Sequence, residues 1–358
     1  MEKFGVVMAG GGGTRFWPLS REKKPKQLLN LTGNDLMINE TIDRMSYSIA
    51  KKNIMIITSA VQAPAMQEAV NGRLLPEHIL AEPAARNTAA CIGYTAMYIL
   101  KKYGDGVMLI TPADHYIRDV KRLTEVFSKG INEAESNDVL VTIGIKPQFP
   151  STGYGYIRYN KNEPGDVKPV IEFKEKPNEE LAKAYVESGE YAWNSGMFIW
   201  KASTILEKIR AFAPDIYAAL EKIGDAMNTL DEQAVLEQVY PAIRSISVDF
   251  AVMEPSAAAG EVKVIPGDFD WNDVGSWDMM SVLHEADKDN NIVIGDGLVL
   301  KSSDCVVYSQ SRTVTVMGVE SLVIVETPDA VMVCGKSHAQ DVKNIVTKLR
   351  EQERKELL

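Results

Sequence analysis

One segment near the start of the chain joins glycines to basic side chains in a way that suits phosphate binding. Residues 8–29 read MAGGGGTRFWPLSREKKPKQLL, with four successive glycines at positions 10–13. Glycines let a ligand approach the backbone closely, and successive free amides in such a turn form a nest for an anion. Arg15 offers a bidentate donor to phosphate oxygens and Lys26 a compact positive charge. The segment therefore predicts an anion site made by Gly10, Gly11 and Gly12 with Arg15 and Lys26.

Two common phosphate-binding loops do not fit this spacing. In the dinucleotide fingerprint G-x-G-x-x-G, the sixth residue counted from Gly10 or Gly11 must be glycine, but it is Arg15 or Phe16. The P-loop also fails, because no Gly-Lys-Ser/Thr follows the first glycine at the required distance. A flexible loop with a solvated basic face is the alternative to a phosphate site. The failed fingerprint excludes a dinucleotide oxidoreductase.

Asp114 is the first acidic candidate, because it follows an apolar run at residues 107–111 that predicts a buried strand. An aspartate just beyond a parallel strand, beside a phosphate site, suits Mg²⁺, which binds one or two carboxylates together with phosphate oxygens. A cap of the following helix is an equally good interpretation of Asp114. We interpret the adjacent His115 as a packing or orienting residue.

Short apolar runs alternate with helix-length amphipathic segments through the first half of the chain. Such alternation predicts an α/β fold with a mostly parallel sheet flanked by helices, in which ligands bind at the carboxyl ends of the strands. The predicted strands are Phe4–Met8, Ile54–Thr58, Val107–Thr111, Val139–Ile145, Gly153–Tyr159 and Val170–Glu175. The predicted helices are Met37–Ala50, Asn87–Lys102, Arg122–Glu135, Glu179–Glu187, Ser203–Phe212 and Asp231–Val239.

The chain changes character at about Ile292, where short β-type runs are punctuated by glycine, serine and proline. A strict hexapeptide repeat is absent, so a sandwich fragment and a few coils of β-helix both fit. Residues 338–358 carry apolar side chains on one helical face, and we expect this helix to pack back on the body. We therefore predict a larger unit at 1–290 and a small all-β, β-helix-like unit with a terminal helix at 291–358.

Composition restricts the class of partner. The 358 residues carry 39 Lys and Arg against 49 Asp and Glu, a net charge of −10, which argues against a nucleic-acid partner. No run approaches the roughly 20 apolar residues of a membrane-spanning helix, and the N-terminus lacks the pattern of a signal peptide. The three cysteines are far apart, so we expect reduced thiols and a cytoplasmic location without membrane contact.

Together with the glycine loop, a series of further motifs is similar to those of one enzyme family. The stretch GGGGTRFWPLSREKKPKQ resembles the signature of the sugar-phosphate nucleotidylyltransferases, in which a glycine-rich loop and an arginine precede Pro-Leu-Ser/Thr and Pro-Lys. Other motifs, in family order, resemble the branch that handles mannose 1-phosphate and GTP. They are EPAARNTA (82–89), TPADH (111–115), TGYGYI (152–157), FKEKP (173–177), WNSGMF (193–198) and WNDVGSW (271–277). The resemblance spans residues 3–350 and implies a Rossmann-like, nucleotide-diphospho-sugar transferase fold.

The resemblance also implies a cation site and a sugar site. Asp114 and Asp273 would hold Mg²⁺ or another divalent cation, with a helix cap as the alternative for Asp273. The sugar phosphate would be bound by Gly155, Glu175, Lys176 and Asn194, with Lys176 on its phosphate. The alternatives are an exposed salt bridge between Glu175 and Lys176 and a turn at Asn194.

The segment at 82–88 is expected near the base and ribose of the nucleotide. Guanine presents N1–H and N2–H donors there, which a carboxylate or a carbonyl could accept. The candidates are Glu82, Arg86, Asn87 and Thr88, and the sequence does not select among them. A structural ion pair between Arg86 and Glu82 is the alternative.

The implied reaction transfers GMP from GTP to α-D-mannose 1-phosphate, giving GDP-mannose and diphosphate. The sugar phosphate is already ionised at neutral pH, so its oxygen attacks the α-phosphorus in line without a general base or a covalent intermediate. Catalysis then rests on positioning and charge neutralisation by Arg15, Lys26 and Asp114. Transfer to another hexose or heptose 1-phosphate, and an inactive regulatory paralogue, are the alternatives.

The sequence is compatible with two arrangements of the C-terminal unit. The C-terminal unit is compatible with packing on the catalytic domain and with a homodimer interface. Some relatives carry a cupin-type isomerase domain after this region, and the chain, which ends at Leu358, is expected to be monofunctional.

Overall fold

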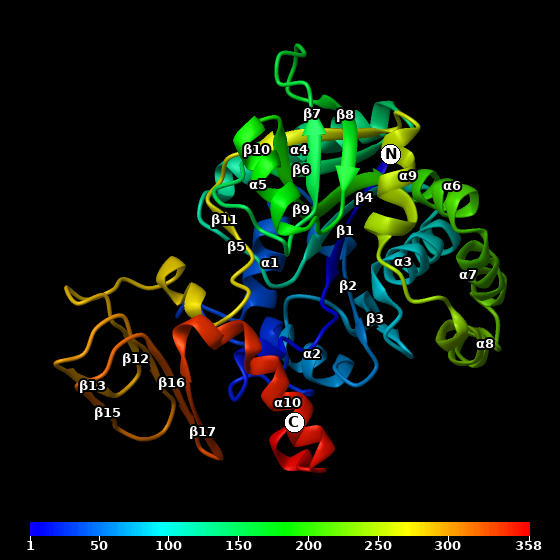
Figure 1. Ribbon diagram of the computed structural model, residues 1–358. Coiled ribbons are helices and arrows are strands. Elements are labelled where there is room, and N and C mark those ends of the chain that lie inside the picture. The colour runs from blue at the N-terminus through cyan, green and yellow to red at the C-terminus, as the bar shows by residue number, and fades with distance from the viewer.

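Nine strands form the central sheet of this computed structural model, which describes residues 1–358 (Figure 1). They are β1 (Glu2–Met8), β2 (Ile54–Ser59), β3 (Ile79–Glu82), β4 (Gly106–Pro112), β6 (Leu140–Ile145), β7 (Tyr156–Tyr159), β8 (Lys168–Lys174), β9 (Tyr191–Lys201) and β10 (Val262–Gly267). Their order is β3-β2-β1-β4-β9-β6-β10-β8-β7, and β1 pairs in parallel with both β2 and β4. Because only β8 and β9 run against the other strands, the prediction of a mostly parallel sheet is confirmed.

Helices cover both faces of the sheet, since successive residues of a strand point to opposite faces. In β1, Phe4 and Val6 join the apolar core on one face, and Val7 joins the core on the other. The first core is covered by α3 (Asn87–Tyr103), α6 (Ala202–Phe212), α7 (Pro214–Ala226), α8 (Glu232–Val239) and α9 (Glu254–Ala258). The second is covered by α1 (Met37–Met45), α2 (Ala63–Ala69), α4 (Val120–Ser136) and α5 (Glu179–Ser188).

The helix predicted over Met37–Ala50 is shorter in the structure, where α1 ends at Met45. The hydroxyl of Ser46 donates to the backbone oxygen of Asp43 at 2.7 Å. Such a local side-chain bond competes with the next turn of the helix, and residues 46–48 form a turn instead.

The small C-terminal unit is a short parallel β-helix. Three strands stack in parallel on one side, with Ile292 beside Val306 and Val306 beside Val323. They are β12 (Ile292–Ile294), β14 (Val306–Ser309) and β16 (Leu322–Thr327), while β13 (Gly297–Leu300) and β15 (Val314–Met317) pair on the other side. An antiparallel strand, β17 (Ala330–Gly335), closes the stack. The β-helix interpretation is confirmed, and the sandwich fragment is wrong.

The terminal helix α10 (Val342–Glu351) packs back on the body, as the sequence predicts. Figure 1 shows it in red, between the orange β-helix and the blue N-terminal segments. Val342 and Val346 share an apolar core with Phe16 and Trp17 of the segment after β1. No helix is long and apolar enough to cross a membrane.

Candidate active site

The glycine loop follows β1 at the carboxyl edge of the sheet and leaves its amides without protein partners. The backbone amides of residues 10–13 donate no hydrogen bond within the protein. The loop is held through its carbonyls, because Gln62 Nε2 donates to the oxygen of Gly11 at 3.1 Å and Ser20 Oγ to that of Gly13 at 2.8 Å. Gly13 has a φ of 58°, and a Cβ there would lie 2.3 Å from the Cβ of Lys26. A tethered loop with free amides matches the predicted nest for an anion.

Lys26 is buried beside this loop and uses all three of its N–H donors within the protein. Its Nζ lies 2.9 Å from Oδ2 of Asp114, 3.0 Å from the backbone oxygen of Asp114 and 2.6 Å from the backbone oxygen of Asp273. Only 6% of its side chain is exposed. Lys26 therefore ties both carboxylate-bearing segments to the glycine loop, and its charge-neutralising role at the substrate stays a prediction.

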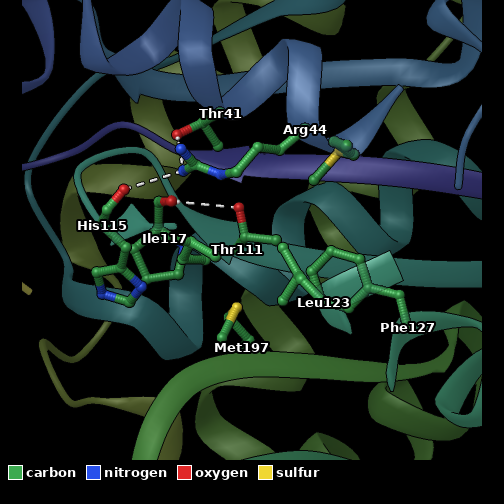
Figure 2. A pocket seen from close by; sticks show the side chains of 10 residues that line it. Thr41, Arg44, Thr111, His115, Ile117, Leu123, Phe127 and Met197 are labelled. Atoms are coloured by element: carbon green, nitrogen blue, oxygen red, sulfur yellow. Dashed lines mark hydrogen bonds between the residues drawn. The ribbon is translucent and has the colours of Figure 1, made fainter. Parts of the chain in front are cut away.

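The turn that carries Asp114 is held by α1. Figure 2 shows Arg44, whose Nη2 donates to the backbone oxygen of His115 at 3.0 Å. Thr41 Oγ1 donates to the backbone oxygen of Ala113 at 3.1 Å. Burial lowers the pKa of Arg44 to about 10. Arg44 has no ion-pair partner, so its contribution is to fix this backbone.

The helix-cap interpretation of Asp114 is wrong. The helix that follows, α4, is capped by Asp119, whose Oδ1 accepts from the amide of Arg122 at 2.9 Å. Asp114 instead faces Lys26 across the ion pair.

Asp114 and Asp273 differ in protonation behaviour although they lie close together. Burial acts to raise the pKa of Asp114, but the ammonium of Lys26 outweighs this and holds it below its ordinary value. Burial raises the pKa of Asp273, and the negative charge of Asp114 adds to the rise, although Tyr154 donates to Asp273 Oδ1 at 2.7 Å.

These two carboxylates fit a divalent cation of the kind that phosphate substrates bring with them. The chain holds no group of three or more His, Cys, Asp or Glu side chains arranged for a metal ion. A cation at Asp114 and Asp273 would therefore complete its shell with phosphate and water oxygens, which is the usual arrangement for Mg²⁺.

His115 packs against Trp271. Its Nδ1 accepts from Trp271 Nε1 at 3.1 Å, and the two rings meet edge to face. This contact joins the short strands β5 (Tyr116–Ile117) and β11 (Trp271–Asn272), which pair antiparallel. Burial lowers the pKa of His115 to about 4, so the ring is neutral at physiological pH.

One cavity of about 340 Å³ brings Arg15 and Lys26 together with Asp114 and Asp273, whereas the predicted Gly10, Gly11 and Gly12 do not line it and Gly13 alone represents the glycine loop. Its lining consists of Gly13, Thr14, Arg15, Lys26, Asp114, His115, Asp273, Gly275 and Lys343. Arg15 has no ion pair and is exposed to the cavity, as a phosphate ligand requires. Sequence reasoning missed Lys343, since only the docking of α10 brings it here.

A second cluster gathers the four residues predicted to bind the sugar phosphate. The amide of Asn194 donates to the oxygen of Gly155 at 2.8 Å, and a Cβ on Gly155 would lie 2.5 Å from Glu175 Oε2. Lys176 Nζ lies 2.8 Å from Glu175 Oε1, with 57% of the lysine side chain exposed but only 6% of the glutamate. The predicted salt bridge between Glu175 and Lys176 therefore forms, but only its lysine is exposed to solvent.

The structure adds Asp249 to this cluster. It opens a π-helical turn at Asp249–Met253, and its Oδ1 accepts from Asn194 Nδ2 at 2.9 Å. Burial, together with the negative charge of Glu175, raises the pKa of Asp249. No sequence signal identified Asp249, because it follows no predicted strand and belongs to none of the family-like motifs. Tyr154, beside Gly155, links the sugar cluster to the cavity through its bond to Asp273.

The nucleotide candidates are only partly brought together. Glu82 ends β3 with Oε2 4.0 Å from where a Cβ of Gly10 would lie, and Tyr240 donates to its Oε1. Burial raises the pKa of Glu82 to about 7. Arg86 donates to the backbone oxygen of Pro241 and makes no ion pair with Glu82, so that alternative is wrong.

Two neighbours of Arg86 form hydrogen bonds to backbone amides. Thr88 Oγ1 accepts from the amide of Val248 at 2.8 Å, and Asn87 Oδ1 accepts from the amide of Thr88 at 2.8 Å. The first bond places the nucleotide segment beside Asp249 of the sugar cluster. The roles of Glu82, Arg86, Asn87 and Thr88 at the base stay predictions.

Comparison with known proteins places these features in context. The family model described as nucleotidyl transferase matches residues 4–290, and that of the MannoseP isomerase/GMP-like beta-helix domain matches residues 289–349. The chain is 37% identical over 357 residues to the alginate biosynthesis protein AlgA of Pseudomonas aeruginosa, covering 98% of this chain and 73% of the relative. It is 39% identical over 359 residues to the mannose-1-phosphate guanylyltransferase of Escherichia coli, covering 98% and 74%.

A solved structure from Thermus thermophilus is similar along its whole length. It is described as a mannose-1-phosphate geranyltransferase and matches with a TM-score of 0.87 at 32% sequence identity. The match covers 98% of this chain and 100% of that one.

Proposed function

Because this chain belongs to the nucleotidyl transferase family, in the branch of the mannose-1-phosphate guanylyltransferases, we propose that its cavity transfers GMP from GTP to α-D-mannose 1-phosphate. The products are GDP-mannose and diphosphate. The observation that carries the proposal is the union, in one cavity, of an unpaired arginine, two carboxylates and Gly13, the last residue of a glycine loop with free amides. A cluster suited to hydroxyl groups lies next to it.

In the proposed reaction an ionised oxygen of the sugar phosphate attacks the α-phosphorus of GTP. A new P–O bond forms there while the bond to the β-phosphate oxygen breaks, and diphosphate leaves with the electron pair. No proton moves in this step, which agrees with a buried, neutral His115. The protein contributes positioning and charge neutralisation.

Each group of residues has a distinct part in this proposal. The amides of residues 10–13 and the guanidinium of Arg15 bind the β- and γ-phosphates. Lys176, more than half exposed, binds the phosphate of the sugar substrate. The carboxylates of Glu175 and Asp249 accept hydrogen bonds from sugar hydroxyls, and Asn194 orients Asp249.

Asp114 and Asp273 would hold the divalent cation, and Lys26 sets the distance between them and the loop. When bound, such a cation neutralises charge that develops on the phosphate oxygens. Glu82, next to Gly10, is our candidate for accepting N–H donors of guanine.

A matrix of nucleotides and sugar phosphates tests the proposal. ATP, CTP, GTP, UTP and dTTP are each combined with mannose, glucose and heptose 1-phosphates, and diphosphate release is followed with Mg²⁺ present. The proposal expects the fastest release with GTP and mannose 1-phosphate. A faster rate with another pair would assign a different specificity, and no release with any pair would favour an inactive regulatory protein.

A further inference from the structure

Lys343 is a cation of the active-site cavity that comes from the C-terminal unit. It lines the cavity with Arg15, Lys26, Asp114 and Asp273, although it lies near the opposite end of the chain from the first two. Lys26 has no donor left for a ligand, since its three N–H groups are taken by Asp114 and Asp273. Lys343 and Arg15 form no ion pair and no side-chain hydrogen bond, so both are available to an anion.

The docking of α10 holds Lys343 at the cavity. Val342 is 1% exposed and Val346 is 6% exposed, and both pack in the core that contains Phe16 and Trp17. Trp17 Nε1 also donates to the backbone oxygen of Leu357 at 2.9 Å, beyond the end of the helix. The helix is therefore anchored on the segment that carries Arg15.

A second anchor reaches the segment that carries Asp273. Gln340 Nε2, just before α10, donates to Ser276 Oγ at 2.6 Å. Lys343 follows the buried Val342 directly, so its backbone is fixed relative to both Arg15 and Asp273. Figure 1 shows α10 in this position between the two units.

Fold stability does not account for a free lysine at this place. Lys343 lies in the first turn of α10, where the helix dipole disfavours a positive charge. Other basic residues of α10 are paired, as Lys348 is with Glu351 at 2.9 Å and Arg350 with Glu22 at 2.8 Å. Lys343 has no such partner, and it faces a cavity in a protein of net charge −10.

We propose that Lys343 binds the β- and γ-phosphates of the nucleotide together with Arg15, and that the C-terminal unit thereby completes the active site. The assignment to these phosphates rests on the proposed function. Arg15 and Lys343 then form a cationic pair, one from each end of the chain, for the diphosphate that leaves in the forward reaction and binds in the reverse reaction. The sugar phosphate, held at Lys176 and Asn194, does not depend on Lys343.

Direct binding of inorganic diphosphate, followed by titration calorimetry with Mg²⁺ present, tests this proposal without turnover. The variants are Lys343→Gln, Lys343→Arg and, as the matched control on the same helix, Lys348→Gln. Loss of a charge-assisted contact is expected to raise the Kd of diphosphate about tenfold in Lys343→Gln, while Lys343→Arg largely restores binding. Lys348→Gln is expected to bind as the wild type does, and all three variants should keep the thermal midpoint of the wild type.

Steady-state kinetics provide the second arm. Lys343→Gln should raise the KM for GTP and, in the reverse reaction, for diphosphate, while the KM for mannose 1-phosphate changes less than about twofold. Unchanged diphosphate affinity in Lys343→Gln, or an equal loss in Lys348→Gln, would overturn the proposal. A wild-type protein that binds diphosphate through Lys343 but does not make GDP-mannose would contradict the proposed function and leave the anion site established.

Discussion

An ion pair of 2.9 Å joins the buried Lys26 Nζ to Oδ2 of the partly exposed Asp114, and the same ammonium reaches the backbone oxygen of Asp273 at 2.6 Å. One side chain thereby connects the glycine loop with the two segments that carry the predicted cation ligands. These segments lie far apart in the sequence, so their alignment depends on the fold and on this contact.

Replacing Lys26 with alanine is expected to lower kcat on the order of a hundredfold, because the carboxylates lose their alignment. It should also lower the free energy of unfolding by about 1–3 kcal/mol, because buried acceptors lose their donor. Steady-state kinetics and urea denaturation measure the two effects. Lys24→Ala, an exposed lysine two residues earlier, is the matched control and should change neither. Wild-type kcat in Lys26→Ala would contradict the positioning role.

Asp273→Asn is expected to lower the cation-dependent rate on the order of a hundredfold or more. The asparagine Oδ1 can still accept from Tyr154, so the fold should be retained. Binding of Mn²⁺, measured by electron paramagnetic resonance, should weaken in parallel with the rate. Near-normal activity and Mn²⁺ affinity would remove Asp273 from the cation site.

Lys176→Gln is expected to raise the KM for mannose 1-phosphate about tenfold while the KM for GTP stays within about twofold. The reason is that Lys176 is largely exposed and contacts only Glu175 of the sugar cluster. Lys174→Gln, at an exposed site without an ion pair, is the control. An equal rise for GTP would place Lys176 in the other half of the site.

Glu82 provides a pH-dependent prediction. Burial raises its pKa from the ordinary 4.5 to about 7, so between these values the folded protein holds a proton that the unfolded chain has released. The free energy of unfolding should therefore fall as pH rises from about 4.5 to 7, and remain lower above pH 7. Glu82→Gln should remove this component and raise stability at pH 8 by up to about 3 kcal/mol. Urea denaturation of both proteins at pH 5 and pH 8 measures this component. If the free energies of unfolding of wild type and Glu82→Gln differ by the same amount at both pH values, the assignment is contradicted.

Sequence reasoning succeeded where residues follow parallel strands. Asp114 and the glycine loop both follow strands of the sheet, and the structure brings Asp114 and Gly13 of the loop into one cavity as the strand-end rule predicts. The patterned helices were also predictable, since their apolar periodicity is local, whereas the β-helix was one of two interpretations that fitted a sequence without a strict repeat. The helix-cap interpretation of Asp114 failed, because Asp119 is nearer to the start of α4.

Other parts depend on tertiary contacts that leave no local pattern. The strand β9 contains Asn194, Ser195 and Gly196, which favour a turn, yet the strand continues past them between β4 and β6, with a φ of 71° at Gly196 and a register shift against β6. Asp249 reaches Asn194 from a π-helical turn, and Lys343 reaches the cavity only because α10 docks on Trp17. These residues could not be assigned before the elements were placed in space.

The most direct test of the account is the formation of GDP-mannose by the isolated chain. Wild type and Asp114→Asn are incubated with GTP and mannose 1-phosphate, with and without Mg²⁺, and GDP-mannose and diphosphate are quantified. The account predicts that the wild type with Mg²⁺ forms GDP-mannose and diphosphate in equal amounts. Without the cation, or without the Asp114 carboxylate, the rate should fall on the order of a hundredfold or more. Equal rates in all four reactions, or no GDP-mannose from the wild type with Mg²⁺, would contradict it.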